Sequence, residues 1–440
     1  MAKHRVINTF KPSKKVVNKP SAKPVTLVID RLADDARGVA RHNGKVVFVE
    51  HALPTETVVA KISRTHKRFD EAVLLDVVDA SPQRVSAICD IYQQCGGCQL
   101  QHLAYPAQLA HKRQRLAEAL GVSACDDVIS GVIESRPREY RHRARLSYSH
   151  GRLGFKARSS HDVVEVAQCP LLEDAINTAL AENREAIERF FGQKANAELL
   201  FSADSTGRVG VRIQKEGYVD LSRSTQLAAE LTAPTFLHSV VGSKGPEWSG
   251  ENAALVYQTL GSQYLQYQPG DFTQVNTEVN RQILSRCLQW MTPQAGERIV
   301  DYFCGLGNFS LAIAETGAKV CGFDAGEQMI ASAQRQAEAA GLNIEYACAD
   351  LFDAAAITIP SGCEKVILDP PRAGAKTLCE QFAVTKTVKQ IVYVSCDPGT
   401  LRRDLLILRE GGYQLVDAVL ADMFPHTRHL ESAIFLNRTA

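Results

Sequence analysis

Short apolar runs separated by turn residues fill the first part of the chain. Runs such as VTLVID and KVVFVE alternate apolar and polar positions, and Gly, Asn, Pro and Thr residues lie between them. An alternation with a period of two is typical of strands, and five short strands in one small segment predict an OB-like β-barrel over residues 17–80. A strand pattern does not by itself identify a ligand.

A different rhythm occupies residues 269–440, where strand-like apolar runs alternate with amphipathic, helix-like segments. The runs are RIVDYF, AKVCGFD, IEYACAD, KVILDP, KQIVYVS, YQLVDAVL and SAIFL. This alternation predicts a doubly wound α/β sheet of the Rossmann-like kind. In such a sheet, ligands bind at the carboxyl ends of the strands, so the residue after each strand is a candidate for the site.

The middle of the chain, residues 81–268, carries a weaker pattern. A helical start near residue 178 precedes stretches such as AELLFSADSTGRVGVRIQ, which fit an antiparallel sheet. We therefore expect a central α+β domain and assign no catalytic residue to residues 178–265. A chain of 440 residues exceeds the usual size of one domain. The expected order is a flexible basic arm over residues 1–16, the barrel, the central domain and the doubly wound domain.

The composition bounds the class of protein. A hydrophobic content of 45% and a charged content of 22% are ordinary for soluble globular proteins, which argues against a fibrous or wholly disordered chain. No stretch of about 18 consecutive apolar residues occurs, and no apolar stretch follows the basic N-terminus. We therefore expect a cytoplasmic protein, acting as a monomer, without a membrane span.

The formal net charge of +1 hides an uneven distribution of charge. The first 25 residues contain Lys and Arg but no acidic residue, and the segment RPREYRHRARLSYSHGRLGFKAR holds eight Lys or Arg against one Glu. Its aromatic residues Tyr140, Tyr148 and Phe155 are able to stack on unpaired bases. Solvated strands explain either basic run alone equally well, but the two together favour RNA as the partner, rather than DNA or a membrane.

Three cysteines are clustered in CDIYQQCGGC, which places Cys89, Cys95 and Cys98 close together, and Cys169 precedes a proline further along. Three thiolates at short spacing and a fourth at a distance predict one inorganic centre with four cysteine ligands. Zinc sites more often show two short Cys pairs, so this spacing favours a 4Fe–4S cluster, with zinc as the alternative. We expect such a cluster to support the fold and the RNA surface rather than to take part in the chemistry.

The first strand of the doubly wound domain runs into DYFCGLGNFSL, where Gly305 and Gly307 let the backbone approach a ligand. The loop lacks the third glycine of a dinucleotide fingerprint and suits S-adenosylmethionine as well. Asp324 ends the second strand, where a carboxylate accepts ribose hydroxyls, and Asp350 follows the third strand, where it can hold an adenine edge. Each alone is equally well explained as a helix N-cap.

Two motifs after the later strands carry the chemistry. Asp369 begins DPPR, where amino-methylating enzymes have an aromatic residue instead of Arg372, so a different activation of the base is needed. Cys396 ends a strand and precedes a helix whose first residues are Asp397 and Pro398. A thiolate that adds to carbon 6 of uracil makes carbon 5 nucleophilic, and the helix dipole favours a thiolate. Burial alone would explain a solitary cysteine, but not this position at a strand end.

A general base is then needed to remove the proton from carbon 5 after methylation. The segment MFPHTRHLESAIFL offers Glu431, with His426 and His429 as rival bases. Glu431 is also compatible with an ordinary surface position at the start of a strand. These residues alone leave the choice open.

Through these motifs the chain resembles the uracil-5 RNA methyltransferases, and among them the 23S rRNA enzymes, over nearly its whole length. The motifs are QVN, DYFCGLGNFSL, LDPPRAGA, YVSCDPGTLRRDL and MFPHTRHLES. The resemblance implies that Cys396 is the nucleophile and Glu431 the base. It also implies a cofactor pocket for S-adenosylmethionine lined by Gln274, Phe303, Asn308, Asp324, Asp350 and Asp369. Asp397 departs from the family, which commonly has Asn, and its charge opposes ionisation of the thiol.

The predicted barrel resembles a TRAM domain, through DRLADDARGVARHNGKVVFVEHALPTETV, which implies RNA binding. The barrel and the cysteine cluster together favour 23S rRNA, because the tRNA-modifying relatives lack the cluster. Methylation of another rRNA or tRNA site is an alternative. A protein of another class, a non-catalytic iron–sulfur RNA-binding protein, is also an alternative, against which Cys396, Asp369 and Glu431 argue.

Overall fold

The computed structural model describes residues 23–158, 160–250 and 254–438 of the chain. The chain divides into two compact units, Met1–Val85 and Ser86–Ala440. The basic arm predicted over residues 1–16 lies outside the described residues. Among the described residues, no helix is long and apolar enough to cross a membrane.

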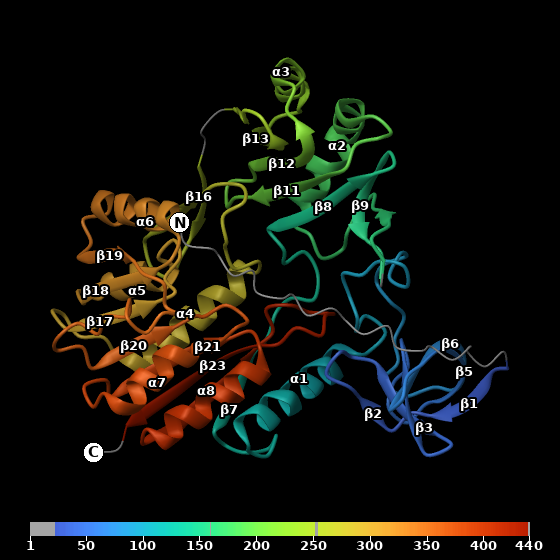
Figure 1. Ribbon diagram of the computed structural model, residues 1–440, viewed down its shortest axis with the longest axis horizontal. Coiled ribbons are helices and arrows are strands. Elements are labelled where there is room, and N and C mark those ends of the chain that lie inside the picture. Colours follow the sequence, from blue (N-terminus) through green and yellow to red (C-terminus); the bar gives the residue numbers. More distant parts are fainter. Residues whose placement is uncertain (1–22, 159, 251–253, 439–440) are drawn as a thin grey trace, which may run out of the picture. The chain divides into compact units, whose positions relative to one another are not determined.

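The first unit is a sheet of short strands around one apolar core, coloured blue in Figure 1. Its described residues form six strands in the order β1-β5-β6-β4-β3-β2, antiparallel except for the β4–β6 pair. The strands are β1 (Val25–Val28), β2 (Arg31–Leu32), β3 (Gly38–His42), β4 (Lys45–Val49), β5 (Thr57–Thr65) and β6 (Phe69–Asp79). The sequence predicted five strands, because β2 has two residues and is too short to show an alternation.

A buried carboxylate closes the end of this unit. Glu56 is fully buried and pairs with Arg84, whose Nη2 donates to Glu56 Oε2 at 2.7 Å. The backbone N–H groups of Leu53 and Ser81 also donate to this carboxylate, at 2.7 and 3.2 Å. Burial opposes ionisation of Glu56, but these hydrogen bonds outweigh it, and its pKa is lowered. The chain just after β6 is thereby tied to the loop before β5.

The second unit contains a mixed sheet, here called the central sheet, backed by two helices. Its order is β10-β9-β8-β11-β12-β13-β14, antiparallel except for the β12–β13 pair. The stretch AELLFSADSTGRVGVRIQ forms β11 and β12, which pair as the sequence predicted. The elements are β8 (Arg143–Ser149), β9 (Arg152–Lys156), β10 (Val163–Glu165), α2 (Asp174–Phe191), β11 (Ala197–Ala203), β12 (Val209–Tyr218), α3 (Leu221–Glu230), β13 (Thr235–Lys244) and β14 (Trp248–Ser249). Ile176 and Leu180 of α2 and Leu227 of α3 belong to its core.

The same unit contains a second sheet, here called the large sheet, which the described residues form in the order β19-β18-β17-β20-β21-β23-β22-β7. Its strands from β19 to β21 are parallel, as the doubly wound prediction requires, and β23 is antiparallel to β21. The strands are β7 (Ile129–Ile133), β17 (Arg298–Tyr302), β18 (Lys319–Asp324), β19 (Ile344–Cys348), β20 (Lys365–Leu368), β21 (Gln390–Ser395), β22 (Tyr413–Ala421) and β23 (Glu431–Arg438).

Helices cover both faces of the large sheet, and each face has its own apolar core. The helices on one face are α4 (Thr277–Met291), α5 (Asn308–Ala314) and α6 (Glu327–Ala339). The helices on the other face are α1 (Tyr105–Leu120), α7 (Lys376–Val384) and α8 (Pro398–Glu410), which Figure 1 shows along the sheet. A two-stranded ribbon, β15 (Leu255–Gln258) with β16 (Tyr264–Tyr267), also packs on the first core. Because both faces are covered, the central strands are apolar throughout, as in β21.

The boundary expected between residues 268 and 269 is not a boundary between compact units, because residues 86–440 form one unit. Two elements that precede residue 268 are part of the large sheet and its cores. The strand β7 pairs with β22, and the helix α1 contributes Leu116 and Leu120 to the core on one face. The sequence pattern did not reveal this, because β7 is five residues long and has no alternation of its own.

Candidate active site

The carboxyl ends of the parallel strands meet a cavity of about 560 Å³. Glu431 reaches the same edge, because β23 runs antiparallel and pairs Ser432 with Ser395 at the end of β21. Among the predicted site residues, the cavity is lined by Gln274, Phe303, Asn308, Asp324, Asp369, Cys396 and Glu431. The structure thus brings together seven side chains that the sequence scatters over more than 150 positions.

The glycine loop after β17 is built to hold a nucleoside. Gly305 and Gly307 both adopt positive φ angles, 55° and 92°, which favour glycine. The N–H of Gly305 donates to Asp324 Oδ2 at 3.0 Å, and the N–H of Gly326 donates to Oδ1 at 2.9 Å. The carboxylate of Asp324 is therefore fixed at the cavity wall, with lone pairs left for ribose hydroxyls. These residues fit the nucleoside part of S-adenosylmethionine.

Asn308 begins α5 and is held by its neighbours. Asn280 Nδ2 and Tyr257 Oη donate to Asn308 Oδ1 at 2.9 and 3.2 Å, and Asn308 Nδ2 donates to Asn280 Oδ1 at 3.0 Å. Tyr257 lies on β15, in the region to which the sequence assigned no catalytic residue, and it lines the cavity. No sequence signal marked it, because its place depends on how the β15–β16 ribbon packs.

Asp350 is the predicted cofactor residue that does not line the cavity. It is exposed, and its Oδ1 accepts the N–H of Phe352 at 3.0 Å in a local turn. Its neighbours Ala349, Leu351 and Phe352 line the cavity instead. The contact of Asp350 with adenine stays a prediction.

Cys396 lies at the N-terminus of α8, as predicted, but its surroundings disfavour the thiolate. Asp397 caps the helix by accepting the N–H of Thr400 at 2.9 Å, and Pro398 follows it. Burial, together with the charges of Glu431 and Asp369, raises the pKa of Cys396 to about 12, although Arg372 lowers it. The expected lowering by the helix dipole is therefore outweighed by burial and by these two carboxylates.

Two buried acids share the cavity with this thiol. Gln274 Nε2 donates to Asp369 Oδ2 at 3.2 Å, yet burial raises the pKa of Asp369 to about 7. Glu431 is 4% exposed, and burial followed by the charge of Asp369 raises its pKa well above the usual range. The two carboxyl groups oppose each other's ionisation, as expected for acids that share one low-dielectric site.

The two histidine alternatives differ in their positions. The ring of His426 lies away from the cavity: its Nε2 is 3.0 Å from the carbonyl oxygen of Pro137 and its Nδ1 is 3.2 Å from Gln108 Nε2. His429 lines the cavity, with its Nδ1 3.2 Å from Arg372 Nη2. Burial and then Arg372 lower the pKa of His429 to about 4, so it is a weak base there. Glu431 is thus a better candidate for the base than His426, because it lines the cavity, and a better one than His429, because its pKa is raised.

A second cavity, of about 530 Å³, is lined by all four predicted cysteine ligands, Cys89, Cys95, Cys98 and Cys169. Burial raises the pKa of Cys95 and Cys169, and raises that of Cys98 to about 12. The thiols add to this effect as neighbours: Cys89 acts on Cys95 and Cys169, and Cys169 acts on Cys98. The four side chains therefore form one group around the cavity.

Arg141 also lines this second cavity, and its guanidinium lowers the pKa of three of these thiols, Cys95, Cys98 and Cys169. A cation at this place compensates thiolate charge. Within the part of the chain that the structure describes, no group of three or more His, Cys, Asp or Glu side chains is arranged to hold a metal ion.

A doubly wound sheet with a glycine loop that lacks the third glycine, and with a fixed carboxylate and a cysteine at its carboxyl edge, is typical of S-adenosylmethionine-dependent methyltransferases. Comparison with known proteins specifies the class further. The chain belongs to the family of S-adenosylmethionine-dependent RNA uracil-5 methyltransferases, which confirms the resemblance seen in its motifs. The family described as tRNA (Uracil-5-)-methyltransferase matches residues 254–439, and the TRAM domain matches residues 23–75.

Similar proteins cover nearly the whole chain. One is the 23S rRNA (uracil(1939)-C(5))-methyltransferase RlmD of Halomonas elongata, 38% identical over 93% of this chain and 89% of its own length. The RlmD protein of Shewanella amazonensis is 35% identical over 96% of this chain and 97% of its own length. A solved structure, the Pyrococcus abyssi tRNA (uracil-54, C5)-methyltransferase in complex with S-adenosyl-L-homocysteine, has a TM-score of 0.75 at 25% identity and covers 94% of this chain and 100% of that chain.

Proposed function

We propose that this protein methylates carbon 5 of the uracil at position 1939 of 23S rRNA, using S-adenosylmethionine. The observation that carries the proposal is the meeting of Cys396, Glu431 and Asp369 in one buried cavity beside a nucleoside-binding loop. Relatives that match nearly the whole chain bear this activity in their names, which supports the choice of substrate. That the chain acts as a cytoplasmic monomer and binds no DNA stays a prediction.

Cys396 is the nucleophile of the proposed reaction. Its thiolate adds to carbon 6 of the uracil, and the electrons of the carbon 5–carbon 6 double bond move into an enolate. S-adenosylmethionine, when bound, supplies the electrophilic methyl group that carbon 5 accepts, with S-adenosylhomocysteine as the leaving group. A neutral uracil carbon is too weak a nucleophile for this step, so the covalent bond to the cysteine is the essential activation.

Glu431 is the base of the proposed reaction. Its carboxylate takes the proton from carbon 5, the double bond forms again, and the bond between carbon 6 and sulfur breaks to release the thiolate. The burial that raises its pKa also makes it a stronger base. Asp369 faces the same space and is bonded to Gln274, so it is suited to orient the uracil ring.

The cofactor residues have separate proposed roles. Asp324 binds the ribose, Phe303 and Asn308 flank the glycine loop, and Asp350 or its neighbours contact the adenine. Phe303 has a positive φ of 65°, which a non-glycine residue adopts at a cost, and such strain is often found at functional sites. Gln274 lines the cavity and donates to Asp369, so it is suited to contact the cofactor there.

We propose that Cys89, Cys95, Cys98 and Cys169, which all belong to the second unit, hold a 4Fe–4S cluster. Each thiolate of such a cluster binds its own iron, so four thiols around one cavity suit it without sharing a single ion. Iron and sulfide analysis of anaerobically purified protein tests this assignment. We expect about four iron and four sulfide per chain, and stoichiometric zinc without iron would exclude it.

The substrate is tested by mapping 5-methyluridine in the RNA of a strain that lacks this gene. We expect the loss of the modification at position 1939 of 23S rRNA and its return with the wild-type gene. A variant with Cys396→Ala serves as the matched control and should not restore it. Loss at another rRNA or at a tRNA uridine instead would move the substrate, and an unchanged modification pattern would reject the proposed activity.

A further inference from the structure

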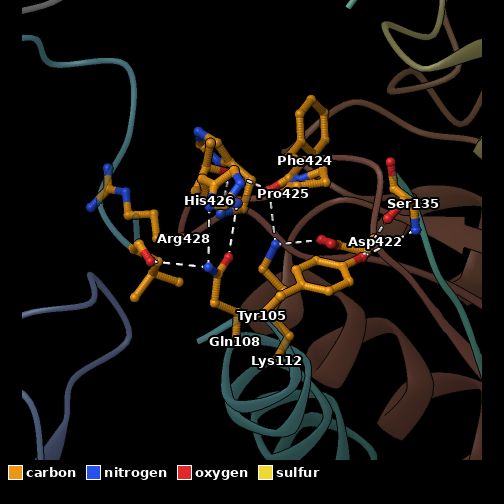
Figure 2. A network of polar contacts seen from close by, with 12 residues as sticks. Tyr105, Gln108, Lys112, Ser135, Asp422, Phe424, Pro425, His426 and Arg428 are labelled. Carbon is orange, nitrogen blue, oxygen red and sulfur yellow. Dashed lines mark hydrogen bonds and ion pairs between the residues drawn. The ribbon is translucent and has the colours of Figure 1, made fainter. Parts of the chain in front are cut away.

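The loop over residues 422–430 forms one wall of the active-site cavity. It connects β22 to β23, and Phe424 and His429 on it line the cavity, while Glu431 follows directly. Figure 2 shows that side chains of α1 reach this loop from below. The groups that hold the loop lie more than 300 positions away in the sequence.

A buried ion pair fixes the start of the loop. Lys112 on α1 and Asp422 both have fully buried side chains, and Lys112 Nζ donates to Asp422 Oδ1 at 2.6 Å. The same ammonium donates to the carbonyl oxygen of Phe424 at 2.9 Å (Figure 2). Burial lowers the pKa of Lys112, and the charge of Asp422 opposes this. A buried ion pair stabilises a fold no better than two apolar side chains do, so its distinctive contribution is a fixed geometry for Phe424.

A second anchor lies one turn earlier on the same face of α1. Gln108 Oε1 accepts the N–H of His426 at 2.9 Å, and Gln108 Nε2 donates to the carbonyl oxygens of Leu100 and Leu103 at 3.0 and 2.8 Å. His426 has a positive φ of 64°, a conformation that a residue with a side chain rarely adopts. The turn in the loop is therefore held in a strained shape by an external partner.

We propose that Lys112 and Asp422, supported by Gln108, are positioning residues of the reaction. They hold Phe424 and His429 against the cavity, so that the uracil is clamped beside Cys396 and Glu431. They touch neither substrate nor cofactor and act only through the 422–430 loop. This inference rests on the proposed function, because the loop is a wall of the site assigned to the uracil.

The test uses a double variant, Lys112→Met with Asp422→Leu, in the full-length holoprotein. Removing both charges leaves neither buried without a partner, so we expect the protein to fold. We expect kcat for methylation of a 23S rRNA fragment to fall about 10- to 100-fold, since small misplacements of a clamped substrate have effects of this size. The KM for S-adenosylmethionine should stay within about threefold, because the loop carries none of the proposed ribose ligands.

A control pair lies at the amino ends of two parallel strands of the large sheet, where Lys365 begins β20 and Glu297 precedes β17. Lys365 Nζ pairs with Glu297 at 2.9 Å and donates to the carbonyl oxygen of Met291 at 2.8 Å, so it has the same two kinds of partner as Lys112, although this pair is partly exposed. Lys365→Met with Glu297→Leu should leave kcat within about twofold of wild type. A double variant at Lys112 and Asp422 that keeps the wild-type kcat, or a control that loses as much, would overturn the positioning role.

Hydrogen exchange of residues 424–428 keeps this inference separate from the proposed function. Measured without RNA, these amides should exchange at least about tenfold faster in the Lys112 and Asp422 double variant and unchanged in the control. Unchanged exchange in both would overturn the inference even if the enzyme is active. If the wild-type protein methylates no uracil, the proposed function fails, and faster exchange confined to the first variant still supports the anchoring of the loop.

Discussion

Replacing Glu431 by glutamine isolates the last chemical step of the proposed reaction. Glu431 is 4% exposed, and burial and the charge of Asp369 raise its pKa well above the usual range, which makes its carboxylate a stronger base. Glutamine has nearly the same shape and no charge, so Glu431→Gln should fold normally. Cys396 should still add to the uracil and the methyl group should still be transferred, but the proton on carbon 5 should remain.

The magnitude follows from the role of a general base, which contributes about 10²- to 10⁴-fold to a rate. This range corresponds to about 3–5 kcal/mol of activation free energy. Release of methylated RNA should slow by this factor, while formation of the methylated adduct stays close to the wild-type rate. A protein–RNA adduct that survives denaturing electrophoresis should therefore accumulate towards one per chain.

The assay uses RNA with tritium at carbon 5 of the target uridine. Tritium release reports proton removal, and mass spectrometry of the trapped complex reports whether a methyl group is present. Cys396→Ala should give neither release nor adduct, and His426→Ala should behave as wild type because its ring lies outside the cavity. Normal tritium release from Glu431→Gln would refute the assignment of the base, and a trapped adduct with His429→Ala alone would move it to that histidine.

Three further predictions concern stability, cofactor and cluster. Burial raises the pKa of Asp369 from the ordinary 3.8 to about 7, so this group destabilises the fold progressively as pH rises from about 4 to 7. Asp369→Asn should therefore raise the free energy of unfolding at pH 8 by up to about 4 kcal/mol in calorimetry while abolishing methyl transfer. Asp324→Ala should weaken S-adenosylmethionine binding by about 10- to 100-fold in titration calorimetry. Asp350 lies outside the cavity, so Asp350→Ala should change this affinity by less than about threefold. An equal loss of affinity in both variants would show that Asp350 contacts the cofactor. The Cys98→Ser protein should lose iron and have a lower kcat, because the N–H groups of Gln99 and Leu100 donate to the carbonyl oxygen of His426 at 3.0 and 2.9 Å. Full activity without iron would disprove this link between the cysteine cluster and the active-site loop.

Much of the fold could be predicted because local patterns determine it. The runs that form β17 to β21 are apolar and are bounded by turns, and in a doubly wound sheet their ends gather at one edge. Asp324, Asp369 and Cys396 could therefore be placed together from their positions after strands alone. The place of β7 in the same sheet could not be predicted, because it depends on pairing with β22 across nearly 300 positions. The packing of α1 on this sheet could not be predicted either.

The electrostatics of the site were less predictable than its membership. The position of Cys396 at a helix N-terminus predicts an easily ionised thiol, yet burial and two carboxylates raise its pKa to about 12. Gln274 was found only through the family resemblance, and its bond to Asp369 links segments 95 positions apart. A sequence pattern shows which residues end strands, but not how far the assembled cavity excludes water.

The raised pKa values of the cavity have a consequence for the order of the proposed reaction. Asp369, Glu431 and Cys396 each favour the neutral form, since a negative charge on one raises the pKa of the others. Arg372 is the cation that lowers the pKa of the Cys396 thiol. The sulfonium of S-adenosylmethionine carries a positive charge, and the thioether of S-adenosylhomocysteine does not. We therefore expect the Cys396 thiol to titrate at a lower pH with S-adenosylmethionine bound than with S-adenosylhomocysteine bound, and an equal pKa with both would contradict this order of events.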